Sequence, residues 1–487
     1  MTQDCRAGGR PVHCIHALGR LGDPAPGLGG FSVITRIEID GFKTFDNFRL
    51  DLRPFTAVVG PNASGKSNLF DAIKFISRLA QTDIREAMQE LRGRPEELFR
   101  RTAAKRSDRM AFAVEVLLEP HGTDPFGKSF ELRTQRIRYE LEIAVRTGAD
   151  RRLEGVYVHR EHCLPIRRRE ERGSLTWNSG SIRYGQQSKP FIATRSGSSE
   201  ESHVIEIRQD GPGKRGRPLG LSAKEASRTG LSTVTTAEFP HLYALRTLLS
   251  STQFLQIDPQ ASRRATDRLA PRRLLPDASN LATVLAKLTE ETRTEKRPDG
   301  LLSDVAADLS SLIPSVAGLV VRDDPGDSEY SFALRLADSL SFSSRVISDG
   351  TLRLLALVTI LNDPQHGGVL CWEEPENGVH EARIPALMEL IRSAAGCTES
   401  AGAQTCFQIL VNTHSPVVMS ALRDCEVVAS DVVSTLTPET QSRTSRTRMR
   451  SGVSSDSESG LTRFEVEEIC PEGDHPSAWN GSQRVER

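Results

Sequence analysis

The sequence predicts an α/β fold in which a mixed sheet is flanked by helices, and three observations support this prediction. The apolar run 55–59 ends in a glycine-rich loop, after which apolar residues return with helical spacing. A second apolar run, 368–372, ends in two carboxylates, and a third, 407–411, ends in polar residues. Short apolar runs that stop at polar residues are typical of buried strands with helices on both faces of the sheet.

Composition excludes several classes of protein. The 63 Lys and Arg residues against 64 Asp and Glu give a net charge of −1, which removes any global electrostatic case for binding a polyanion. The chain has no apolar run of about 18 residues, and its first residues carry Gly and Pro where a secretory signal needs an apolar stretch. The 8 Cys residues form no C-x-x-C pair, which argues against a zinc ribbon and a disulfide framework. We therefore expect a cytoplasmic protein that makes no membrane contact.

Shifts in composition predict how the 487 residues are organised. We expect a disordered leader over 1–32, the N-terminal lobe of a head domain over 33–80, and an inserted α+β region over 81–340. The C-terminal lobe of the head is expected over 341–428, and a flexible Ser/Thr-rich tail over 429–487.

The middle of the chain shows weaker periodic patterns. Helices are predicted over 84–99, 241–249 and 281–288, and strands over 110–118, 137–145 and 204–207. Two arginine-rich stretches, 151–172 and 263–273, have two interpretations, either as solvated faces paired with Glu or as contacts with the phosphate backbone of DNA.

The glycine-rich loop carries the strongest motif, a full match to G-x-x-x-x-G-K-[ST] between a strand and a helix. Its glycines let the backbone N–H groups and the helix N-terminus point at phosphate oxygens. In this motif the lysine neutralises the β- and γ-phosphates and the serine ligates Mg²⁺, so ATP and Mg²⁺ are the predicted cofactors. The candidate binding residues are Gly60, Pro61, Asn62, Ala63, Ser64, Gly65, Lys66, Ser67 and the following Asn68.

The run 368–372 ends in Glu373 and Glu374. Buried carboxylates are costly unless they are paired or bind a cation, and a solvated strand end is the alternative interpretation. Successive strand residues point to opposite sides, so we predict that Glu373 ligates the metal while Glu374 orients or deprotonates the attacking water.

Two further motifs follow the same logic. Ser348, Asp349 and Gly350 stand at a predicted helix start, where a plain N-cap is the alternative to a binding role. His414 follows the run 407–411, where it can reach a γ-phosphate or be purely structural.

The order of these four motifs resembles the ABC-type ATPases of the RecF and structural-maintenance-of-chromosomes branch, and most closely bacterial stand-alone AAA-family ATPases related to the OLD proteins. In those relatives the motifs are Walker A, signature, Walker B and switch histidine. The resemblance extends over 33–425 and includes Ile39-Asp40-Gly41-Phe42-Lys43 ahead of Walker A and the run from Glu373 to His380. It implies a P-loop NTPase with an ABC-type ATPase head.

Three further observations concern the Q-loop, the nucleotide and a nuclease domain. The Q-loop glutamine is not assigned, with Gln135 and Gln187 as candidates. The absence of any Asn-Lys dipeptide favours ATP over GTP. Between Pro416 and the Ser/Thr-rich tail the acids are only Asp424, Glu426 and Asp431, which do not suggest the nuclease domain of OLD proteins.

The resemblance implies an enzyme that hydrolyses ATP and works as a switch. Because the signature of one chain contacts the nucleotide of another, it implies a homodimer or a pair with a paralogue. A separate effector in anti-phage defence is favoured, with DNA as a further partner. Two alternatives remain open: a DNA repair or recombination ATPase, and an ATP-dependent scaffold with little turnover. A transporter subunit typically carries Ser-Gly-Gly where this chain has Ser348-Asp349-Gly350.

Overall fold

The computed structural model describes residues 32–451, except for 103–105, 148–152, 172–181, 186–188, 196–202, 212–218, 224–225, 325, 327, 365–366, 401–402 and 438–441. The expected leader, apart from residue 32, and the tail beyond 451 lie outside the described residues. Within the described part of the chain, no helix is long and apolar enough to cross a bilayer.

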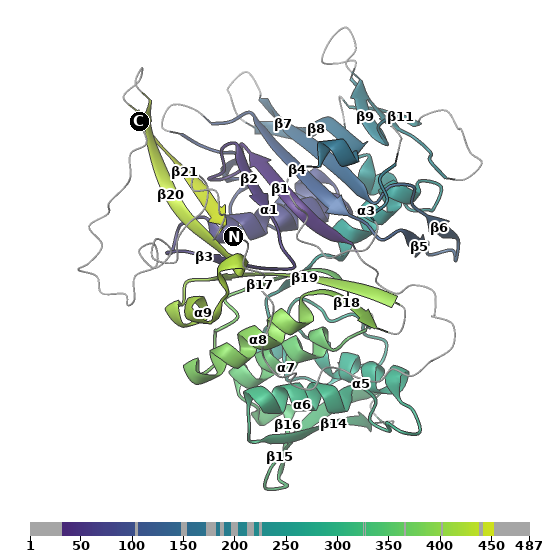
Figure 1. Cartoon of the computed structure of the whole chain (residues 1–487), viewed down its shortest axis with the longest axis vertical. Coiled ribbons are helices and arrows are strands. Elements are labelled where there is room, and N and C mark those ends of the chain that lie inside the picture. The colour runs from purple at the N-terminus through teal and green to yellow at the C-terminus, as the bar shows by residue number, and fades with distance from the viewer. Residues whose placement is uncertain are drawn as a thin grey trace, which may run out of the picture.

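Across the described residues, eight strands form an antiparallel sheet in the order β11-β10-β9-β8-β7-β4-β1-β2 (Figure 1). The bounds are β1 Val33–Asp40, β2 Phe48–Asp51, β4 Arg109–Leu117, β7 Arg136–Thr147, β8 Leu153–Pro165, β9 Ile192–Arg195, β10 Val204–Ile207 and β11 Leu219–Ser222.

A second sheet has the order β12-β17-β19-β3-β20-β21, with β18 paired to β19. The strands from β12 to β20 are parallel to one another, and the outer pairs β20-β21 and β18-β19 are antiparallel, so the sheet is mixed as predicted. The bounds are β3 Phe55–Val59, β12 Gln253–Leu255, β17 Gly368–Glu373, β18 Gly396–Ser400, β19 Ala403–Thr413, β20 Val427–Thr437 and β21 Ser442–Ser451. The smaller sheets use β13 Thr266–Asp267, β14 Val316–Asp324, β15 Glu329–Leu336 and β16 Ser341–Ser343, and β5 His121–Thr123 with β6 Ser129–Glu131.

Helices cover both faces of the mixed sheet. They are α1 Lys66–Leu79, α2 Ile84–Gln89, α3 Pro240–Ser251, α4 Pro259–Ser262, α5 Leu281–Thr292, α6 Leu302–Leu312, α7 Asp349–Leu361, α8 Ile384–Ala394 and α9 Pro416–Ala421. Single-turn 3₁₀ helices are η1 Pro95–Glu97, η2 Arg168–Glu170, η4 Leu231–Thr233, η5 Ser344–Val346, η6 Glu381–Arg383 and η7 Asp424–Glu426.

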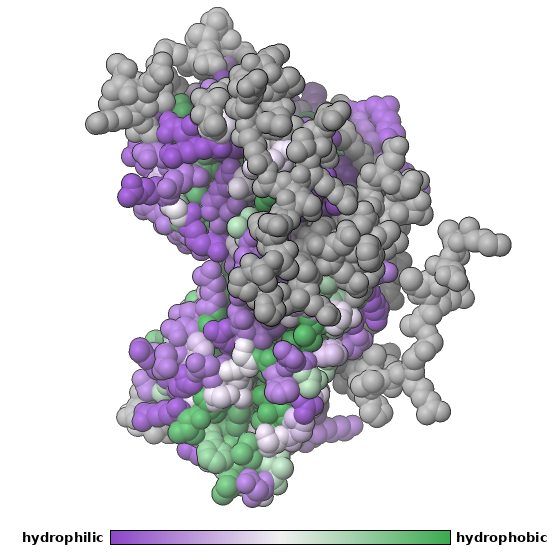
Figure 2. Space-filling model, turned by 90° about the vertical axis from the view of Figure 1, so that its left-hand side faces the viewer, coloured by the Kyte–Doolittle hydropathy of each residue, from purple (hydrophilic) through white to green (hydrophobic). Residues whose placement is uncertain are grey.

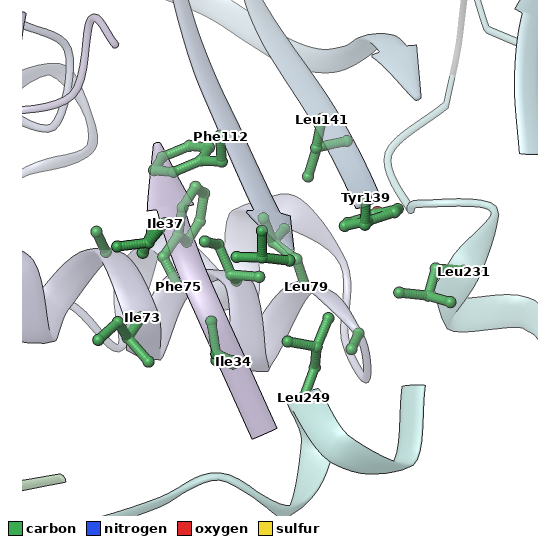
Figure 3. Packing of buried hydrophobic residues seen from close by; sticks show 14 of the residues in the cluster. Ile34, Ile37, Ile73, Phe75, Leu79, Phe112, Tyr139, Leu141, Leu231 and Leu249 are labelled. Atoms are coloured by element: carbon green, nitrogen blue, oxygen red, sulfur yellow. The ribbon is translucent and has the colours of Figure 1, made fainter. Parts of the chain in front are cut away.

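The alternation of side chains along the parallel strands explains the layers. Val58 and Leu410 pack into one apolar core with α1 and the antiparallel sheet, whereas the adjacent Val59 and Val411 pack into a second core with α5 to α8. Helix α1 is therefore enclosed between the two sheets, and Figure 3 shows its Phe75 and Leu79 directed towards strands of the antiparallel sheet. The α/β fold expected from the apolar runs is confirmed.

Three expectations about organisation are wrong. The region 81–340 is not a separate insertion, because β4 pairs with β1 along its length and β7 and β8 extend the same sheet. The predicted helix over 84–99 ends at Gln89, since Gly93 has a φ of 101° and Pro95 follows two residues later. The chain after Val428 continues as the hairpin β20–β21, so a flexible tail does not begin at 429.

Candidate active site

The glycine-rich loop links the buried strand β3 to α1, as the motif requires. Gly65 precedes the helix with a φ of 96°, a left-handed conformation that side chains rarely adopt. Lys66 folds back over the loop, where its Nζ donates hydrogen bonds to the carbonyl oxygens of Gly60 at 2.6 Å and Pro61 at 2.8 Å. The amine therefore lies above the concave side of the loop, where the phosphates of a nucleotide are expected.

The loop meets the first of the two glutamates. Strand β17, which ends at Glu373, is separated from β3 only by β19. The Ser67 hydroxyl donates a hydrogen bond to Glu373 Oε2 at 3.3 Å, although the residues are 306 positions apart. A hydroxyl and a carboxylate oxygen at this separation suit a Mg²⁺ ion, which takes oxygen ligands at about 2.1 Å and fills its other positions with water and phosphate.

An arginine that the sequence analysis missed holds the other oxygen of Glu373. Arg92 Nη2 lies 2.9 Å from Glu373 Oε1 and also contacts Ser67 O at 3.2 Å and Asp71 Oδ1 at 3.3 Å. Lys43 Nζ lies 2.6 Å from Asp71 Oδ2. The two cations and two carboxylates thus form a compact network around the candidate metal site. The break at Gly93–Pro95 is the only local signal that marks this segment as a loop and not a helix.

The second glutamate meets the predicted histidine. Glu374 has a φ of 50°, and its backbone N–H donates to Asn412 O at 3.0 Å. Asn377 Nδ2 donates to Glu374 Oε2 at 2.7 Å, and His414 Nδ1 lies 3.3 Å from Glu374 Oε1. This turned-out backbone and these two contacts fix the direction of the carboxylate. The structure thus brings the side chains of Glu374 and His414 together, and their predicted roles stay predictions.

A third carboxyl group in the loop after β17 was also missed. Glu376 accepts a hydrogen bond from the Thr413 hydroxyl, and burial raises its pKa above the ordinary value. Its other oxygen, Oε2, is buried and has no hydrogen-bond partner. Burial of Glu376 thus works against its charged form, and Glu376 lies two residues from Glu374 in the same loop.

Ser348 caps α7. Its hydroxyl accepts a hydrogen bond from Thr351 N at 3.3 Å, and the exposed Asp349 pairs with Arg263. A Cβ on Gly350 would lie 2.0 Å from Gly378 O, so the helix start abuts the loop that follows Glu374. Among the described residues, the side chain of Ser348 hydrogen bonds to Thr351 and not to the phosphate loop. The N-cap role is therefore confirmed, and the binding role of Ser348 stays a prediction.

A cavity of about 180 Å³ opens beside Glu373 and Arg92, and Gln256 lines it. Gln256 directly follows β12, which pairs in parallel with β17. Gln135, one of the two candidate glutamines, is instead buried in the antiparallel sheet region, where its Nε2 donates to Leu118 O at 3.0 Å. Gln187 lies outside the described residues. The short strand 253–255 directly before Gln256 was the sequence signal that could have placed this glutamine at the end of a strand beside the site.

Comparison with known proteins finds short matches to chromosome-maintenance proteins. Segments of 44 and 45 residues are 52% and 47% identical to the chromosome partition protein Smc of Methanocaldococcus jannaschii and to the structural maintenance of chromosomes protein 1 of Arabidopsis thaliana. Each segment is 9% of this chain and 4% of the relative, so the chain spans only a small part of these proteins.

Solved structures give a weaker likeness. The Smc head bound to the C-winged helix domain of ScpA has a TM-score of 0.46 at 13% identity, covering 86% of this chain and 98% of that one. The Pyrococcus furiosus Smc head with an extended coiled coil has the same TM-score and identity over 86% and 97%.

A family model matches residues 55–420, which include the phosphate loop, both glutamates and the predicted histidine. The finer resemblance to the RecF and OLD branch stays a prediction. Because the match extends over well more than half of the 487 residues, the chain belongs to the family described as "AAA domain, putative AbiEii toxin, Type IV TA system".

Proposed function

We propose that this chain is an ATP-hydrolysing molecular switch that dimerises around ATP. The observation that supports this best is that Ser67, Glu373, Glu374 and His414, which come from three distant parts of the sequence, meet at one edge of the parallel sheet. The carboxyl ends of parallel strands are where α/β sheets bind ligands.

Nucleotide binding rests on the phosphate loop. The N–H groups of the loop and of the first turn of α1 bind the phosphates, and Lys66 exchanges its bonds to Gly60 and Pro61 for phosphate oxygens. Ser67 and Glu373 are the residues that would hold Mg²⁺, which when bound neutralises phosphate charge and polarises the γ-phosphate. Gln256, at the next strand end, takes the Q-loop position beside this site.

Hydrolysis rests on Glu374. Its carboxylate accepts a proton from the water that attacks the γ-phosphorus, and the products are ADP and phosphate. Asn377 and His414 hold the two oxygens of the carboxylate, so the base has one direction before the nucleotide arrives. His414, with a side chain 42% exposed, is free to contact the γ-phosphate as well.

Dimerisation follows from the place of the signature. Ser348 stands exposed at the N-terminus of α7, a position that suits an anion supplied from outside the chain. Exposed apolar side chains precede it, with Leu340 56%, Phe342 40% and Val346 67% accessible. Figure 2 shows apolar residues gathered on part of one face of the lower half of the molecule, whereas the upper half is largely hydrophilic there. A second copy, or a paralogue, completes each nucleotide site.

The hydrolysis proposal is tested by phosphate release from the purified chain with Mg²⁺ and ATP. Lys66→Ala should abolish it, whereas Lys128→Ala, which removes a positive charge from an exposed turn, should not. Equal turnover in the wild type and Lys66→Ala would show that the phosphate loop is not the catalytic site.

The family description names a type IV toxin–antitoxin system. We therefore favour a defence pathway in which this ATPase acts with a separate effector. A repair or recombination ATPase is the second candidate, motivated by the short matches to chromosome-maintenance proteins. Duplex DNA should stimulate a repair ATPase, whereas the product of a neighbouring gene should change the turnover of a defence ATPase. A scaffold would turn over slowly with either. Measurement of ATPase activity with each addition separates the three.

A further inference from the structure

The hairpin β20–β21 lies against the outer side of the phosphate loop. Its Ser430 and Thr447 are almost completely buried, with 0% and 3% of their surface accessible. Ser430 Oγ donates to Ser64 O at 3.0 Å, and Thr447 Oγ1 donates to the same oxygen at 3.1 Å. A single carbonyl of the loop is thus held by two hydroxyl groups from opposite strands of the hairpin.

The hairpin also accounts for both glycines of the motif. A Cβ on Gly60 would lie 2.4 Å from Ser430 O, and a Cβ on Gly65 would lie 2.1 Å from Thr447 Oγ1. Both distances are shorter than van der Waals contact allows. The backbone of the loop therefore touches the hairpin directly, with no side chain of its own between them.

A directed chain of hydrogen bonds links Asn68 in the first turn of α1 to Ser64 in the loop through Thr44 and Thr447. Asn68 Nδ2, which can only donate, lies 2.9 Å from Thr44 Oγ1, and Thr44 Oγ1 lies 2.7 Å from Thr447 Oγ1. Ser64 O can only accept, so each hydroxyl in the chain donates towards the loop. Thr447 N also donates to Thr44 O at 3.0 Å. Hydrogen bonds in such a series polarise one another, and each strengthens the next.

The direction of this chain determines where a neighbouring N–H group points. No peptide bond among the described residues is cis, and in a trans peptide the C=O and the N–H point in opposite directions. Because the Ser64 carbonyl is held towards the hairpin, the Gly65 N–H is turned towards the concave side of the loop. That is the side on which, under the proposed function, the phosphates bind.

We propose that Ser430 and Thr447 are positioning residues of the nucleotide site, which orient the Ser64–Gly65 peptide so that its N–H is presented to phosphate. This inference rests on the proposed function. It assigns to the hairpin a role in ATP affinity, and it implies the reciprocal effect, in which bound nucleotide stabilises the hairpin.

The test compares variants that change only the hydroxyl groups. Thr447→Val keeps the shape of the side chain and removes its hydroxyl, Thr447→Ser keeps the hydroxyl, and Ser430→Ala removes the second donor. The double variant combines Thr447→Val with Ser430→Ala. Ser445→Ala is the matched control, because Ser445 is on the same strand and pairs with Ser434 at 3.0 Å and not with the loop. Affinity for a fluorescent ATP analogue is measured, together with the unfolding temperature without nucleotide.

Loss of one hydrogen bond should weaken ATP binding by about 2- to 13-fold, and loss of both by more than 10-fold, because the carbonyl is then left without a donor. Thr447→Ser and Ser445→Ala should bind like the wild type. In hydrogen exchange, nucleotide should slow the amides of 427–433 and 444–450 in the wild type, and less in Thr447→Val.

The outcomes separate this inference from the proposed function. A wild type that binds no nucleotide would overturn both. A wild type that binds, with Thr447→Val and the double variant binding equally well, would overturn the inference alone, as would a Thr447→Ser variant as weak as Thr447→Val. If the double variant does not fold, the comparison of Thr447→Val with Thr447→Ser still decides whether the hydroxyl at position 447 supports ATP binding.

Discussion

Replacement of Glu374 by Gln tests the assignment of the catalytic base most directly. The change keeps the size of the side chain and its capacity to hydrogen bond to Asn377 and His414, and it removes the negative charge that accepts a proton. Binding and chemistry should therefore separate in this variant, because only the second needs a base.

The structure sets the size of each effect. The side chains of Glu374 and His414 are 39% and 42% exposed, so the loss of this pair should cost about 0.2–1 kcal/mol, less than about a fivefold change in affinity. Loss of a general base lowers kcat by about 10²- to 10⁴-fold, which corresponds to about 3–5 kcal/mol in the barrier. The expected result is therefore a variant that binds ATP and hydrolyses it very slowly.

The assay combines phosphate release at saturating ATP with nucleotide affinity from fluorescence. Glu381→Gln, which neutralises an exposed carboxylate at the start of η6, is the control and should behave like the wild type. A Glu374→Gln variant with kcat within about threefold of the wild type would remove Glu374 from the role of base. A loss of affinity as large as the loss of kcat would show instead that the residue supports binding.

Three further outcomes are expected. Lys66→Ala should weaken ATP binding by about 100-fold, as measured by fluorescence, because the amine is the charge that faces the phosphates. This corresponds to about 2.7 kcal/mol, near the upper end of the range of about 1.5–3 kcal/mol for hydrogen bonds to charged groups, and unchanged binding would contradict it. Ser348→Arg should bind nucleotide normally but should neither dimerise nor hydrolyse ATP, as checked by light scattering with ATP. Ser311→Arg on α6 is the control, and a dimeric Ser348→Arg variant would argue against the shared site. Glu161 is fully buried and its pKa is raised by burial, so its contribution to stability is present below about pH 4.5 and is lost as pH rises through the higher folded pKa. In urea unfolding, Glu161→Gln should therefore gain stability relative to the wild type between pH 4.5 and 7, and a difference that does not change with pH would refute this.

Much of the site was predictable because its chemistry is local in the sequence. The phosphate loop needs its glycines, Lys66 and Ser67 at fixed spacing between a strand and a helix, and Glu373 stands where an apolar run ends. The meeting of Ser67 with Glu373 then follows from the sheet, since parallel strands bring their carboxyl ends to one edge.

The rest depends on pairings that the sequence does not encode locally. The hairpin β20–β21 was predicted as a flexible tail because this segment is rich in Ser and Thr and has low hydrophobicity. In the structure only part of each strand, such as Val433 and Met449, is buried. Arg92 and Gln256 follow short elements whose positions are fixed by the strands and helices around them. A rule based on periodicity detects a buried face and does not detect a residue that is placed by the rest of the fold.

The contact between Gly350 and Gly378 couples the turn after β17 to the N-terminus of α7. The two backbones touch with no side chain between them, so no rotamer change can absorb a displacement. A shift of the turn after β17 therefore displaces the N-terminus of α7. The contacts of a partner bound at the N-terminus of α7 would therefore change when the turn moves. A methyl group added at Gly350 would lie 2.0 Å from Gly378 O, so it would push the two segments apart and displace the N-terminus of α7.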